Sequence, residues 1–132
     1  MALSLAIQFA KRVFQLAGIW GLFILSIAYA GYLLGLKGAT VDTARPEFVH
    51  GFFLVTLAWQ IAFLLIATDP ARYRPLMLAA ILEKFPFALT VFVLYANGQV
   101  STLMLALGLI DGVLGALFTL AYLRTNPSRQ VS

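Results

Sequence analysis

The chain has 132 residues, of which 62% are hydrophobic and only 11% are charged, whereas a soluble domain is normally about one-quarter charged. It contains no cysteine, which excludes disulfide bonds, thiolate metal sites and dithiol redox chemistry. The net charge of +4 does not indicate nucleic-acid binding, because the basic residues flank long apolar blocks instead of forming a basic patch.

Almost all of the apolar residues fall in four blocks, each long enough to cross a hydrocarbon core of about 30 Å as a helix. We therefore predict one domain over residues 1–132, an all-α integral membrane protein folded as an up-down bundle of four helices. The spans are expected at about residues 13–36, 48–68, 76–96 and 102–123. Membrane lipids are the expected neighbours. No cofactor and no metal site is predicted, since the single histidine cannot supply two axial ligands to a haem.

The first block follows Lys11 and Arg12 and imitates a secretory signal, because it contains the A-x-A cleavage pattern at residues 28–30. The apolar run continues beyond that pattern, so we expect a retained transmembrane helix with the preceding residues as its extension. Gly18, Gly21, Gly31 and Gly35 in this block suit close helix packing, and Gly31 and Gly35 have the GxxxG spacing that favours it.

The second block contains two informative polar residues, His50 near one end and Gln60 near the middle. A glutamine in the middle of a span usually faces protein, because its amide finds no hydrogen-bond partner in lipid. We favour an interhelical hydrogen bond for Gln60 over contact with a ligand. His50 is expected to be an interfacial residue beside water or the connecting loop, in preference to proton transfer or metal binding.

The third block carries adjacent Glu83 and Lys84, followed by Pro86. Ionisable residues inside a membrane cost several kcal/mol unless they are paired, so they mark a candidate functional site. Glu83 lies about 12 Å from the start of the helix near Pro75, at about 1.5 Å per residue. Lys84 points about 100° away from Glu83 and should snorkel towards the membrane surface, so the adjacent pair should not bond face to face. Pro86 should bend the helix, which either opens a cavity or helps the bundle to fit.

Asp111 lies almost at the centre of the fourth block, where Gly108 and Gly112 allow another helix backbone to come close. In an antiparallel bundle, four polar side chains fall at overlapping depths: Gln60, Glu83, Lys84 and Asp111. These residues permit a network in which Lys84 pairs with one of the acids and Gln60 supplies neutral hydrogen bonds. The network favours a polar staple that fixes the helix register. A pocket for an amphipathic molecule and a proton-coupled transport or redox role remain open.

A short polar loop, an aromatic-rich helix, the residues Asp69-Pro70-Ala71-Arg72 and a helix with an early Glu83 follow one another in this order. This pattern covers about residues 48–83 and resembles the bacterial DoxX-like and BphX-like small membrane proteins. The resemblance implies a four-helix protein of the bacterial inner membrane, often without a defined activity. Some relatives are associated with quinone-linked sulfur oxidation. No catalytic motif carries over to this sequence.

Basic residues are distributed unevenly between the two sides of the predicted bundle. One side holds six of them, Lys11, Arg12, Arg72, Arg74, Arg124 and Arg129, and the other holds two, Lys37 and Arg45. Positive residues favour the cytoplasmic side, so both termini are expected in the cytoplasm. Labelling at Thr43 and Ser128 would distinguish the two orientations.

The sequence has many packing features and few reactive ones, so the favoured function is a non-catalytic accessory or scaffold subunit, or a homo-oligomer, with a buried polar cluster. The alternative is a pocket protein, either an enzyme or a proton-coupled transporter, for a small amphipathic, lipid-like or quinone ligand. The pocket is expected between the second, third and fourth spans beside Pro86, with Lys84 as a structural ion pair. Its polar groups would be Gln60, Glu83 and Asp111, and its apolar wall Trp59, Phe63 and Phe87.

Overall fold

The computed structural model describes residues 2–36 and 45–130, so the positions Lys37 and Thr43 named above lie outside the described residues. Four long helices, α1 (Ala2–Leu33), α2 (Pro46–Thr68), α3 (Arg74–Ala96) and α4 (Thr102–Arg124), are followed by the short 3-10 helix η1 (Pro127–Gln130). This element order confirms the predicted all-α four-helix bundle. The residues before position 13 belong to α1, as expected for an extension of the first span.

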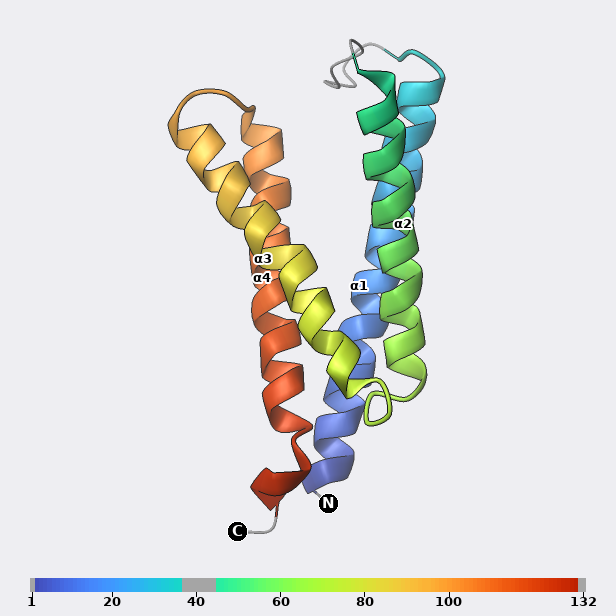
Figure 1. Cartoon of the computed structure of the whole chain (residues 1–132), viewed down its shortest axis with the longest axis vertical. Helices are drawn as coiled ribbons and strands as arrows, with labels where there is room; N and C mark the ends of the chain where they lie inside the picture. The colour runs from blue at the N-terminus through green and yellow to red at the C-terminus, as the bar shows by residue number, and fades with distance from the viewer. Residues whose placement is uncertain (1, 37–44, 131–132) are drawn as a thin grey trace.

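Consecutive helices run antiparallel, so both chain termini and the α2–α3 connection lie at one end of the molecule (Figure 1). We call this the terminal end, and we call the opposite end, which carries the α3–α4 turn, the open end. Helix α1 packs along α2, and α3 packs along α4. Helix α1 also contacts α4, whereas α2 hardly touches α3. The bundle therefore consists of two helical hairpins that meet near the terminal end and diverge towards the open end (Figure 1).

The helix ends at the open end depend on two glycines and one serine. Gly35 follows α1 with a φ of 64°, and Gly98 follows α3 with a φ of 71°, in the left-handed region that glycine adopts without strain. The reversed backbone satisfies the last carbonyls of these helices, as where the Leu36 N–H donates to the Gly31 carbonyl at 3.0 Å. Helix α4 begins after Ser101, whose hydroxyl accepts a backbone N–H of the first turn.

The hydrophobic core lies in the half of the molecule nearer the terminal end, where all four helices contribute. The Phe14 ring of α1 stacks on the Phe118 ring of α4 with the ring centroids 4.3 Å apart. The Phe63 ring of α2 meets Phe118 edge-on at 4.9 Å. Small side chains and Met77 fill the space around the three rings, chiefly Ala10, Ala17, Ala67, Ala80 and Ala121. These small residues let the helices come close together in this half of the molecule.

Glycines set the close contacts within each hairpin. A Cβ at Gly18 of α1 would lie 2.9 Å from the backbone oxygen of Gln60 in α2. In the second hairpin, a Cβ at Gly108 would lie 2.7 Å from the Val91 side chain of α3. The predicted close packing at Gly31 and Gly35 is wrong, because no described atom approaches their Cβ positions within 4 Å. Both glycines lie near the open end of α1, where the hairpins diverge.

All four long helices are long and apolar enough to span a membrane. Large apolar side chains cover their outward surfaces, including Leu16, Leu65, Leu82 and Leu109. A continuous apolar surface of this extent suits lipid, whereas a soluble monomer rarely exposes a patch so large. The fold is that of a multi-pass membrane protein.

Candidate functional site

A cleft of about 1000 Å³ lies between the two diverging hairpins and is lined by all four helices. Ser101 at the start of α4 and Asp111 near its middle both line the cleft. Asp111 follows Ser101 by ten positions, so the cleft extends about 15 Å along α4. Most of its wall is apolar, with contributions from Trp20, Ile24, Phe52, Phe53, Phe87 and Leu107. The polar residues at the deep end are Gln60, Glu83, Lys84 and Asp111.

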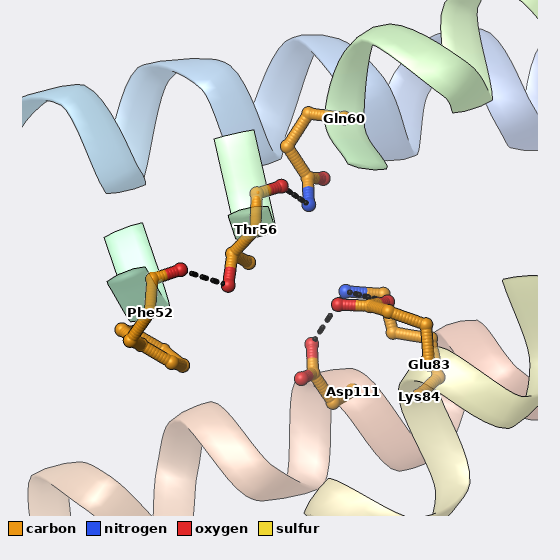
Figure 2. A network of polar contacts seen from close by, with 6 residues as sticks. All are labelled: Phe52, Thr56, Gln60, Glu83, Lys84 and Asp111. Atoms are coloured by element: carbon orange, nitrogen blue, oxygen red, sulfur yellow. Dashed lines mark hydrogen bonds and ion pairs between the residues drawn. The ribbon is translucent and has the colours of Figure 1, made fainter. Parts of the chain in front are cut away.

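Lys84 is the centre of an ion-paired cluster at the deep end of the cleft. Its Nζ atom lies 3.2 Å from Oε2 of Glu83 and 3.1 Å from Oδ1 of Asp111, so it joins α3 to α4 (Figure 2). The prediction that Lys84 snorkels away from Glu83 is wrong, because its side chain is only 5% exposed and its ammonium forms an ion pair with Glu83. Its flexible four-carbon stem lets the ammonium turn back towards Glu83 despite the 100° separation expected on a helix.

Both acids face the cleft and Lys84, as expected for carboxyl groups that avoid lipid. Their side chains are 16% and 20% exposed for Glu83 and Asp111, respectively, and both are more open than Lys84. The cluster combines two carboxyl groups with one ammonium. When both acids are ionised, one negative charge therefore remains after pairing.

Gln60 approaches this cluster from α2, across the cleft (Figure 2). The expected interhelical hydrogen bond is wrong, because its Nε2 atom donates to the Thr56 carbonyl of the same helix at 3.0 Å. Its Oε1 atom is buried and accepts no hydrogen bond from the described residues. Gly21 of α1 makes room for the amide, since a Cβ there would overlap the Gln60 side chain. The deep end of the cleft thus contains a hydrogen-bond acceptor to which no described residue donates.

The apolar residues proposed for the wall differ in position. Phe87 lines the cleft and lies near Phe52, with ring centroids 6.3 Å apart. Phe63 and Trp59 do not line it. Phe63 is fully buried in the core and Trp59 packs against that core. Phe63 nevertheless lies beneath the cluster, with the Lys84 ammonium 5.3 Å from its ring centroid.

The position of the cleft also differs from the prediction. Helix α1, which was not expected to contribute, supplies Trp20, Gly21 and further residues as far as Gly31. The reason is the packing of the hairpins, because α1 contacts α4 while α2 and α3 barely touch. Pro86 is exposed and does not line the cleft, although α3 continues through it.

A second polar contact was not predicted from the sequence. The Tyr29 hydroxyl of α1 lies 2.7 Å from Nδ1 of His50 in α2. The rings of Tyr32 and Phe53 surround the pair, with Tyr29 and Phe53 stacked at 4.9 Å. A signal for it existed, because Tyr29 is four residues from the end of α1 and His50 is four residues from the start of α2. In an antiparallel hairpin, positions equally far from the facing helix ends fall at the same depth.

Arg74 has a structural contact that the charge pattern alone did not indicate. Its Nε and Nη2 atoms donate to the Tyr122 carbonyl at 3.2 and 3.0 Å. The guanidinium also lies over the Tyr122 ring, 3.8 Å from its centroid. A cation at the carbonyl end of a helix is favoured by the helix dipole. Arg74 therefore fastens the start of α3 to the end of α4.

Comparisons of the chain with protein-family models, with curated proteins and with solved structures found no significant match. The fold and the site define its class without them. It is a four-helix membrane bundle with an ion-paired cluster at the deep end of a largely apolar cleft.

Proposed function

We propose that this protein binds a small amphipathic molecule in the cleft between its hairpins. The observation that carries the proposal is the cleft of about 1000 Å³, which has apolar walls and a polar cluster at its deep end. Ligand sites are typically concave, mostly apolar and provided with a few polar groups that fix orientation, in a volume of roughly 300–1,000 Å³. The cleft matches this description and is large enough for a lipid-like or quinone-sized molecule.

The polar and apolar parts of the cleft would bind different parts of the ligand. The aromatic and aliphatic wall accepts the body of the ligand, with Phe52 and Phe87 on opposite hairpins. The cluster around Lys84 holds its polar end through hydrogen bonds or charge, in an environment where an unmatched polar group is costly.

Two matched glycine variants test the pocket. Gly31 lines the cleft and Gly51 of α2 does not, yet both have open space at the Cβ position. We expect Gly31→Leu to fold normally but to reduce the amount of small molecule retained after purification in mild non-ionic detergent. A loss of about tenfold would require only about 1.4 kcal/mol of binding energy. The measurement is mass spectrometry of the extracted ligand per mole of protein.

The Gly51→Leu variant is the control and should retain the wild-type amount. Equal retention by both variants, or no retained molecule in the wild-type protein, would contradict the pocket.

A second candidate function, an accessory or scaffold subunit or a homo-oligomer, is favoured by the scarce contact between α2 and α3. In that case the cleft would receive a helix from another chain. Co-purification of a second chain, lost in Gly31→Leu, would support this candidate instead.

We also propose that the protein lies in a bacterial inner membrane with both termini in the cytoplasm. The positive charge gathered at the terminal end supports this orientation, as Arg72, Arg74 and Arg124 all lie there (Figure 1). The resemblance of residues 48–83 to DoxX-like and BphX-like proteins supports the membrane assignment. On the basis of this resemblance we also propose that the chain is a member of that group.

Single-cysteine labelling tests the orientation, and the chain has no native cysteine to interfere. Ser128 and Gln99 are both exposed and lie at opposite ends of the bundle. We expect a membrane-impermeant thiol reagent to label Gln99→Cys in intact cells that have a permeabilised outer membrane. Ser128→Cys should react only after the inner membrane is opened. Labelling of Ser128→Cys in intact cells would reverse the topology.

A further inference from the structure

We infer that the ligand of the cleft is a lipophilic cation, whose positive centre lies beside Asp111 and Glu83 at the deep end. This inference rests on the proposed binding function and names the chemical class of the ligand. An amphipathic amine or a quaternary onium compound belongs to this class.

The first argument is the charge balance of the deep end. One ammonium, that of Lys84, is shared by two carboxyl groups at 3.1 and 3.2 Å, so it can neutralise only one of them when both are ionised. Among the described residues, the other cation that lines the cleft is Arg45, which lies at its mouth, fifteen residues before Gln60. That spacing is about 22 Å along a helix, which exceeds the distance over which exposed charges act in physiological salt. A bound cation would neutralise the negative charge that remains on the two carboxyl groups.

The second argument is the balance of hydrogen-bond donors and acceptors. Lys84 already donates to Asp111 and lies against Glu83, and Thr56 donates its hydroxyl proton to the Phe52 carbonyl at 2.6 Å. The second carboxylate oxygen of Asp111 points away from Lys84 and accepts no hydrogen bond from the described residues (Figure 2). The buried Oε1 atom of Gln60 likewise has no hydrogen-bond donor among the described residues. The site therefore has spare hydrogen-bond acceptors, which suit a ligand that carries an N–H donor or a positive charge.

The wall of the cleft agrees with such a ligand. Trp20, Phe52, Phe53 and Phe87 present aromatic rings to the same space. Aromatic faces attract cations through their quadrupoles and also accommodate the apolar groups of a lipophilic cation. An anionic head group would instead meet two carboxyl groups at the deep end.

Two rigid probes of nearly equal size and opposite charge test this inference. Tetraphenylphosphonium is a lipophilic cation and tetraphenylborate a lipophilic anion, and their binding is measured by equilibrium dialysis in non-ionic detergent with empty micelles subtracted. We expect the wild-type protein to bind the phosphonium at least about tenfold more tightly. A unit charge about 4 Å away, at an effective dielectric constant of about 20, accounts for more than this factor.

Substitutions in the cluster test whether the cation binds beside the two acids. Asp111→Asn and Glu83→Gln should each weaken phosphonium binding by about tenfold or more, because each removes a negative charge and keeps the side-chain shape. Glu47→Gln is the matched control, since Glu47 is an exposed acid of α2 that does not line the cleft. Its affinity should stay within about twofold of wild type, because the charge is distant and screened.

The outcomes separate this inference from the proposed function. If both probes bind equally, or the borate binds more tightly, and Gly31→Leu still weakens binding, the pocket stands and the preference for cations is overturned. If neither probe binds and no small molecule is retained, both proposals fail. Should an acid variant not fold, the comparison of the two probes on the wild-type protein still decides the question.

Discussion

Replacing Lys84 with methionine is expected to lower the free energy of unfolding by about 3–5 kcal/mol. The substitution removes the ammonium that lies 3.2 Å from Glu83 and 3.1 Å from Asp111, and it leaves two carboxyl groups facing one another without a counter-ion. Breaking a buried pair from one side is costly because the remaining charge stays buried and uncompensated. Unfolding in mixed micelles with increasing SDS, followed by circular dichroism, measures the change.

The matched control is Lys11→Met, at an exposed lysine of α1, which should change the stability by less than about 0.5 kcal/mol. A triple variant, Glu83→Gln with Lys84→Met and Asp111→Asn, should recover most of the loss, because it removes the charges together. Wild-type stability of Lys84→Met alone would show that water in the cleft solvates the acids, and the cluster would not be a structural tie between α3 and α4.

Replacing Gly18 with valine is expected to destabilise the protein by about 3 kcal/mol, at the upper end of the usual cost of overpacking. A Cβ at this position would lie 2.7 Å from Cγ of Leu64 and 2.9 Å from the backbone oxygen of Gln60. The leucine side chain can move, but the backbone oxygen cannot move without separating α1 from α2. The same unfolding experiment measures the effect.

Gly51→Val is the control for this variant, because no described atom lies within 4 Å of a Cβ at Gly51. Both positions are interior to a helix and receive the same β-branched side chain, so the difference isolates the contact between the helices. Equal destabilisation of the two variants would mean that the effect arises from valine itself, and the close approach at Gly18 would carry no special stability.

The position of the ion-paired cluster has a consequence for the stability of the two hairpins. Lys84 and Arg74 join α3 to α4 at two levels, through Asp111 and through the Tyr122 carbonyl. The first hairpin is joined by the close contact at Gly18 and, near the open end, by the bond between Tyr29 and His50. Each hairpin therefore has its own ties between its two helices.

The sequence by itself determined the parts of this protein that depend on local properties. Apolar runs of membrane-spanning length predicted four helices, because hydropathy and helix length follow from the residues alone. The high cost of a charge in lipid placed Glu83 and Asp111 towards the interior, whatever the detailed packing. Gly108 was correctly assigned to a close helix contact, since it lies beside a polar residue that must be buried.

Only the tertiary structure decided where the cleft lies and how its polar groups are paired. The cleft results from the angle between the two hairpins. This angle depends on contacts between α1 and α4, two helices that are distant in the sequence. The pairing of Lys84 with both acids depends on the rotamer of a flexible side chain, which helical spacing does not determine. The pairing of Gln60 also depends on the tertiary structure. Its side-chain N–H donates to the Thr56 carbonyl one turn earlier, whereas its amide oxygen lies against Gly21 of α1, where no described residue donates to it.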